Sequence, residues 1–151
     1  MKKFQFGLEH VRDYRDRLLE EELGKLQRLK AALAQVESRI QQLNQEFSQV
    51  SAQLAQAQRR GTTSAQIQCL GLQLEAARLQ LRELEAQRKK AQQQVDLQTR
   101  IVVEANQEVS KLDKLKERQL DAYRTQAAKA EEQQVEELVS QSHARKAGEP
   151  V

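Results

Sequence analysis

Apolar residues recur at alternating spacings of three and four along most of the chain. Between residues 26 and 57, two interleaved series each repeat every seven residues, and every position in both is apolar. A sustained repeat of 3.5 residues is typical of a coiled-coil seam, so this stretch predicts a long helix with one packed face. The two series are Leu26, Leu33, Ile40, Phe47 and Leu54, and Leu29, Val36, Leu43, Val50 and Ala57.

A second run of the same kind covers residues 67–112 and predicts a second long helix. Only Arg88 and Gln98 interrupt its apolar seam, and a weaker stripe continues after Leu112 through Leu115, Leu120, Tyr123, Ala127, Ala130 and Leu138. The second run holds the seam positions Ile67, Leu70, Leu74, Ala77, Leu81, Leu84, Arg88, Ala91, Val95, Gln98, Val102, Ala105, Val109 and Leu112.

The two runs are separated by one strong break. Gly61 suits the left-handed residue that ends a helix, and Thr63 with Gln66 reads as a capping box that opens the next one. We therefore predict a hairpin tip at 61–63, after a lead of residues 1–7 and a first helix over 8–60. The second helix is predicted over 64–143, with an overhang beyond about residue 120 and a flexible tail at 144–151.

Pairing the two runs about this tip tests the hairpin. If the numbers of facing residues add to about 124, Leu54 faces Leu70, and Phe47, the largest seam residue of the first run, faces the small Ala77. Pairing large with small side chains keeps a narrow core at constant width. The predicted fold class is all-α: an antiparallel two-helix coiled-coil hairpin with a longer second helix.

Composition fits a narrow seam better than a wide core. Aromatic residues are 3% of the chain, charged residues are 31%, and there is no Trp. The net charge of +3 comes from 25 basic and 22 acidic residues, a mixed surface that disfavours nucleic-acid binding. The lack of a long apolar run predicts no transmembrane segment and no signal peptide, so the cytoplasm is expected.

Candidate chemistry is sparse. His10 and His143 have no second His or Cys beside them, and Cys69, the single cysteine, has neither a nearby His nor a CxxC partner. There is no Gly-rich phosphate loop. We therefore expect no catalytic residues, no cofactor and no metal, and a protein that is not an enzyme.

Two features instead indicate contact surfaces. Near the tip, Leu72 and Leu79 point away from the first helix, in a stripe with Ala65, Cys69 and Ala76. The stripe favours either partner binding or a tolerated surface patch or dimer contact. At the other end, Arg12, Arg15 and Glu22 fall on the seam, which indicates a choice of register, a partner, or a frayed coil end.

Two stretches of the sequence are distinctive: Lys3-Phe4-Gln5-Phe6-Gly7-Leu8 at the start and Leu112-Asp113-Lys114-Leu115-Lys116-Glu117-Arg118 before Tyr123. Both resemble the FliJ family of flagellar type III export proteins. The acidic run at 131–138 also fits the family, and the likeness covers nearly the whole chain. Ile67 and Leu70 stand where the family usually carries aromatic residues.

The resemblance implies a cytoplasmic stalk whose two-helix coil is similar to the central stalk of rotary ATPases. This stalk would be peripheral at the inner face of the cell membrane when assembled and monomeric alone. Implied partners are the export ATPase ring, whose assembly it would promote, the cytoplasmic domain of the export gate, and export chaperones. The ring-binding residues implied, here termed the base set, are Arg12, Arg15, Leu115, Arg118, Leu120 and Tyr123. The gate-binding residues implied, the tip set, are Leu70, Leu72, Leu74, Ala77 and Leu79.

Three other functions are compatible with a helical hairpin. One is the equivalent stalk of a virulence type III secretion system. Another is a structural coiled coil that self-assembles through the stripe near the tip. The third, a basic helix that binds nucleic acid or anionic membrane, is disfavoured by the near-balanced charge and the scarcity of aromatic residues.

Overall fold

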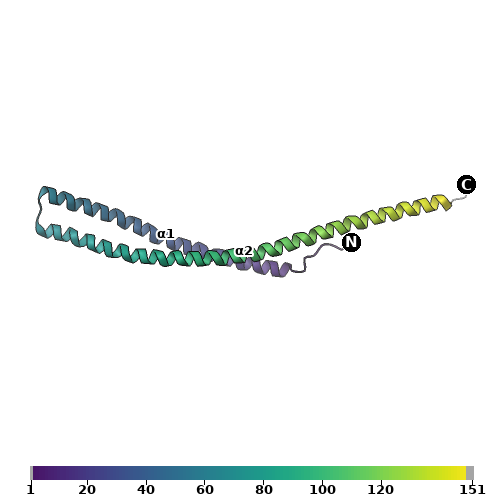
Figure 1. Cartoon of the computed structure of the whole chain (residues 1–151), viewed down its shortest axis with the longest axis horizontal. Helices are drawn as coiled ribbons and strands as arrows, with labels where there is room; N and C mark the ends of the chain where they lie inside the picture. The colour runs from purple at the N-terminus through teal and green to yellow at the C-terminus, as the bar shows by residue number, and fades with distance from the viewer. Residues whose placement is uncertain (1, 149–151) are drawn as a thin grey trace. The chain divides into compact units, whose positions relative to one another are not determined.

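The computed structural model describes residues 2–148, which form two long α-helices. Helix α1 spans Glu9–Arg60 and helix α2 spans Ser64–Gly148. The helices are antiparallel and pack together as a hairpin with the second helix longer (Figure 1). The predicted all-α coiled-coil hairpin is confirmed.

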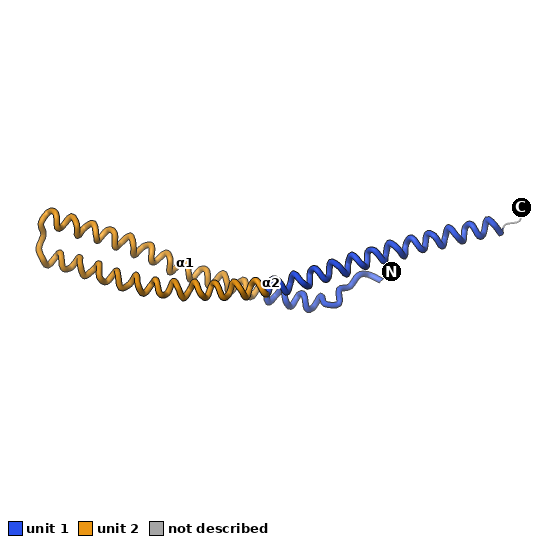
Figure 2. The backbone as a smooth tube through the Cα atoms, in the orientation of Figure 1, with its two compact units in different colours: residues 1–18, 105–151 blue, residues 19–104 orange. Residues whose placement is uncertain are grey.

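The contacts within the chain divide it into two units (Figure 2). The first unit contains Met1–Leu18 and Ala105–Val151, and the second contains Leu19–Glu104. Each unit combines a piece of α1 with a piece of α2, so each has its own stretch of the seam.

The helix ends differ slightly from the predicted ones. Helix α1 begins at Glu9 and not at residue 8, and α2 continues to Gly148 and not to 143. The expectation of a flexible tail from residue 144 is therefore wrong for residues 144–148, which are helical. Ala, Arg and Lys are good helix formers, and Arg145 and Lys146 lie in the last turn, where cations favour the helix dipole. Residues 149–151 lie outside the described part.

The seam follows the predicted heptads closely. Every predicted seam position between residues 26 and 112 is buried or half-buried, and from residue 27 to residue 60 all other residues of α1 are exposed. Nearer the start of α1, Arg15 was also predicted on the seam but is exposed. The most covered are Leu43 at 3% exposure, Val95 at 6%, Val109 at 7% and Leu26 at 9%. Most other seam residues remain half-exposed, because two helices alone cannot surround a side chain.

The predicted pairing of a large with a small residue also appears. Phe47 and Ala77 line one shallow concavity together with Val50 and Leu74, a second pair expected to face each other. Because Ala77 leaves room beside the ring, the Arg78 guanidinium reaches it, with its carbon 5.7 Å from the ring centroid of Phe47. Such a cation–π contact adds to the packing at this partly open layer.

The tip is built from Gly61 and two threonines. Gly61 has φ +78°, the left-handed conformation predicted for the helix end. The Gln66 backbone N–H donates to Thr63 Oγ1 at 3.3 Å, which is the first half of the predicted capping box. The other half differs, because Gln66 Oε1 accepts from the hydroxyl of Thr62 at 2.6 Å.

We expect Gly61→Ala to lower the free energy of unfolding by about 1 kcal/mol, since an L residue is strained in this conformation. No atom lies within 4 Å of the position that a Cβ would take, so the cost is conformational and not steric. Gly71→Ala is the matched control: it lies inside α2, also in open space, and should stabilise by about 0.5–1 kcal/mol. Urea denaturation checks both, and equal effects would contradict the role of Gly61.

Candidate functional site

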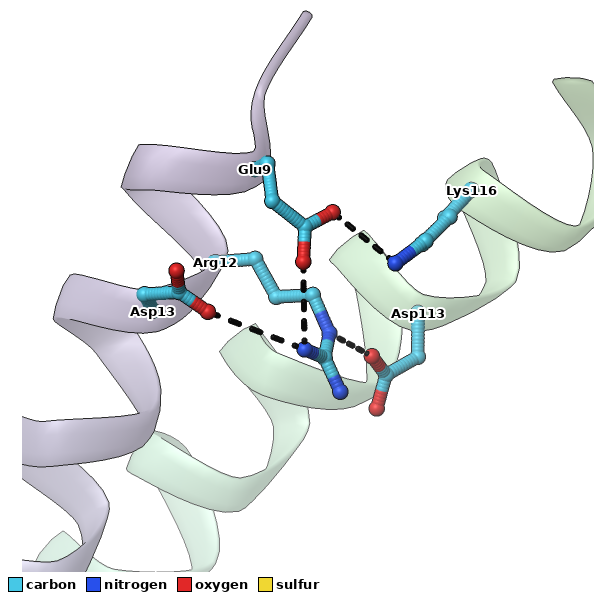
Figure 3. A network of polar contacts seen from close by, with 5 residues as sticks. All are labelled: Glu9, Arg12, Asp13, Asp113 and Lys116. Carbon is cyan, nitrogen blue, oxygen red and sulfur yellow. Dashed lines mark hydrogen bonds and ion pairs between the residues drawn. The ribbon is translucent and has the colours of Figure 1, made fainter. Parts of the chain in front are cut away.

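An ion-pair network joins the two helices in the first unit (Figure 3). Arg12 of α1 donates through Nε to Asp113 of α2, and Lys116 Nζ lies 2.9 Å from Glu9 Oε2. On its own helix, Arg12 Nη1 lies 3.6 Å from Glu9 and 3.8 Å from Asp13. The hydrogen bond to Asp113 is the main cause of a raised pKa of Arg12. Arg12, a charge on the seam, is thus balanced by a carboxylate from the opposite helix.

The network contributes more to specificity than to stability. Its side chains are between 31% and 51% exposed, so solvent and salt screen them. Because two of its pairs cross between helices, sliding one helix along the other would separate the charges. The predicted interpretation of Arg12 as a register-setting seam charge therefore has a structural basis.

A second polar layer interrupts the seam in the other unit. Gln98 is 8% exposed, and its Nε2 donates to the backbone oxygen of Glu22 at 3.0 Å and also to the Glu22 carboxylate. Lys25 Nζ lies 3.3 Å from the same carboxylate. The hydrogen bond from Gln98, followed by that from Lys25, lowers the pKa of Glu22 and outweighs the effect of desolvation. Glu22, the seam carboxylate noted in the sequence, is thus matched to a seam amide.

This layer makes an acid-dependent contribution to stability. The folded chain holds the pKa of Glu22 below its unfolded value of 4.5, so the contribution is present above that pH and is lost as the pH falls below it. We expect the free energy of unfolding of Glu22→Gln to fall less steeply than that of the parent chain as the pH drops below about 4.5. Glu21→Gln, at the exposed neighbouring position, is the control, and its free energy of unfolding should fall with pH as steeply as that of the parent chain. Thermal melts between pH 3 and pH 7 check this, and two identical profiles would contradict it.

A short non-helical segment packs against α2 in the first unit. We call residues 2–6 the strap. The Tyr123 hydroxyl donates to the backbone oxygen of Lys2 at 2.6 Å, and the Phe4 ring lies 5.7 Å from the Tyr123 ring at an angle of 49°. Phe6 is only 8% exposed, which makes it the one buried apolar residue outside the helices among those described. The predicted lead is therefore a packed element.

The strap is close to energetic balance. Fixing the backbone of residues 2–6 costs roughly 5–10 kcal/mol in conformational entropy. Burying Phe6, partly burying Phe4 against Tyr123 and forming one hydrogen bond together contribute roughly 3–8 kcal/mol. The closed arrangement thus depends on Phe4 and Phe6, since the hydrogen bond alone is too weak to order the segment.

The base set does not form one free surface. Arg12 is bonded to Asp113 and Tyr123 to the strap, while Leu115 and Leu120 are half-buried. Only Arg15 and Arg118 are exposed. Sequence reasoning noticed Phe4 and Phe6 as a motif but assigned them no contact, although two of the three Phe of the chain within three residues was a usable signal.

The tip set divides between two faces of α2. Leu70, Leu74 and Ala77 are half-buried on the seam, whereas Leu72 and Leu79 are 70% and 60% exposed. The expectation that these two leucines point away from α1 is confirmed. A single partner can therefore contact most of the surface of Leu72 and Leu79, whereas the three seam residues of the set expose only part of theirs while the hairpin is closed.

Comparison with known proteins identifies the family. The sequence profile of the family described as "Flagellar FliJ protein" matches residues 4–148. The chain belongs to the FliJ family. Among solved structures, this FliJ-family chain is similar to CT670 from Chlamydia trachomatis, described as a YscO homologue, with 23% identity and a TM-score of 0.62. That match covers 95% of this chain and 99% of the other, and it shows a shared fold. A search of curated proteins found no significant match.

The residues matched to the FliJ family include both Phe4 and Tyr123. Within residues 2–148, no three His, Cys, Asp or Glu side chains gather in a way that could hold a metal ion. Neither helix, over its described length, contains a segment apolar enough to span a bilayer. The distinctive features of this FliJ-family chain are thus its packed and exposed surfaces.

Proposed function

We propose that this chain is a non-enzymatic stalk of the flagellar protein export apparatus, acting on the cytoplasmic side of the membrane. The observation that carries the proposal is the family match, which extends over residues 4–148. The structure supports it with a two-helix coiled coil whose second helix continues past α1. Residues 131–148 of α2 are exposed at every position, including Val135, Leu138 and Val139. An extended helix with free apolar side chains suits insertion into a ring of subunits.

In this proposal, the base of the hairpin enters the export ATPase ring and promotes ring assembly. Arg118 of the base set is exposed, so it is available to a partner without disturbing the hairpin. The exposed face with Leu72 and Leu79 meets the cytoplasmic domain of the export gate, and the chain also escorts export chaperones. Coupling between ring and gate then follows from one chain that contacts a partner at each end.

The ring contact is tested with the purified export ATPase. We expect the chain to raise ATPase assembly and turnover, and Arg118→Glu to weaken this stimulation at least fivefold by reversing an exposed charge. Arg28→Glu, an equally exposed reversal on α1, is the control and should stimulate normally. Light scattering and phosphate release measure assembly and rate. If the parent chain raised neither ATPase assembly nor turnover, the proposal would be contradicted.

The gate contact is tested at the exposed leucines. We expect Leu72→Glu with Leu79→Glu to keep helicity and melting temperature but to weaken gate binding by tenfold or more, because both side chains are more than half exposed. Gln73→Glu with Gln80→Glu adds the same charge at exposed neighbouring positions and serves as the control. Circular dichroism and titration calorimetry separate the outcomes, and unfolding of the leucine variant would show that these residues belong to the core.

A second candidate function is self-assembly through Leu72 and Leu79, which their exposure also favours. Sedimentation velocity distinguishes the two. A monomer at micromolar concentration supports the stalk, whereas a dimer that the double glutamate variant dissociates supports a self-assembling coiled coil.

A further inference from the structure

The α2 face around Tyr123 is occupied by the chain itself. The strap lies on it, with Phe6 buried, the Phe4 ring tilted against the Tyr123 ring and the Lys2 carbonyl bonded to the Tyr123 hydroxyl. Tyr123 belongs to the base set, which the proposed function brings to the ring. The strap and the proposed ring partner therefore compete for the same face of α2.

The strap is attached in a way that permits release. Between its residues 2–6 and α2, the hydrogen bond from Tyr123 is the only one in the described structure. Lys2, Lys3 and Gln5 are exposed, so attachment rests on two ring side chains. The strap forms no helix or strand that would have to break on opening. Because its ordering cost and its contacts nearly cancel, a modest competing interaction can displace it.

The end of the strap is tied to α1, whereas its start is held by one hydrogen bond, from the Tyr123 hydroxyl to the Lys2 oxygen. The Glu9 backbone N–H donates to the Phe6 oxygen at 3.2 Å, which ties the strap to the first turn of α1. Lys116 holds Glu9 in place and, with Phe4, Phe6 and His10, lines a shallow concavity between the strap and α2. Opening can therefore pivot about Phe6 and Gly7 while the helices stay paired.

We propose that residues 2–6 are a releasable lid: closed in the free protein, it covers the α2 face around Tyr123, and the export ATPase ring displaces it on binding. This proposal rests on the proposed function for the identity of the partner. The free energy needed to open the lid then reduces the affinity of the chain for the ring. Weakening the lid should then tighten ring binding.

Closure is measured without any partner. The chain has two Tyr and no Trp, so a Tyr14→Phe background leaves Tyr123 as the sole reporter of intrinsic fluorescence. In that background, Phe4→Ala with Phe6→Ala should raise the acrylamide quenching constant of Tyr123 about twofold. Lys3→Ala with Gln5→Ala shortens two exposed side chains of the same strap and should leave quenching unchanged. Equal quenching in all three proteins would overturn the closed lid.

Shielding is measured with the purified ATPase ring. The Phe4→Ala, Phe6→Ala variant and a chain lacking residues 2–6 should both bind three- to tenfold more tightly than the parent, with far-UV helicity retained. Weaker binding of both would overturn the lid and show that the phenylalanines contact the ring. If neither the parent chain nor the variants bind the ring, the proposed function fails. The quenching result then decides by itself whether the strap closes.

Discussion

Leu43→Ala is expected to lower the free energy of unfolding by about 2–3 kcal/mol, near the lower end of the usual range for removing a buried leucine. Leu43 is the least exposed apolar side chain described, at 3%, in a seam where most positions are half-exposed. It also lines the concavity shared by Phe47 and Leu74, so water can partly fill the space that the truncation leaves. Partial filling moderates the cost that an enclosed cavity would carry.

The matched control is Leu72→Ala, the same change at a position that is 70% exposed, which should shift stability by no more than about 0.5 kcal/mol. Guanidinium titration of both variants, followed by circular dichroism at 222 nm, gives the comparison. Similar midpoints for the two variants would mean that the heptad seam is not the core of this fold.

The seam could be predicted from sequence because one rule governs it. A repeat of 3.5 residues specifies a helix and its buried face together, so the covered positions between residues 26 and 112 were correctly identified. Gly61 could be predicted for a similar reason, since glycine alone adopts φ +78° without strain. Local rules of this kind need no knowledge of tertiary contacts.

The contacts at the base of the hairpin, those of Arg12, Glu22 and the strap with α2, could be predicted only in part because they join residues far apart in the chain. Heptad analysis placed Arg12 and Glu22 on the seam, but their partners Asp113 and Gln98 depend on the rotamers of long side chains across the helix pair. The strap has no periodicity, so nothing local showed that Phe4 would lie on Tyr123. Its composition was informative, whereas its docking position was not.

The pairing of the helices predicts a strong effect from one new covalent bond. In a Cys69→Ser background, Ile40→Cys with Leu84→Cys should oxidise to a disulfide within one chain, because these seam positions are expected to face each other. Arg39 and Leu84 line one concavity, which places this turn of α1 beside this turn of α2. Closing a loop of roughly 45 residues should stabilise the fold by about 4 kcal/mol if the bond forms without strain.

The control for this bond is Ile40→Cys with Leu72→Cys, since Leu72 lies on the exposed face and cannot reach the seam. Non-reducing electrophoresis should show a compact monomer for the first pair and none for the second. Two chains lying side by side in parallel would bring residue 40 against residue 40 and give a covalent dimer even with the single Ile40→Cys change. A dimer of that kind would exclude the hairpin, and with it the packing of the base and the strap, because both need α2 to return along α1 of the same chain.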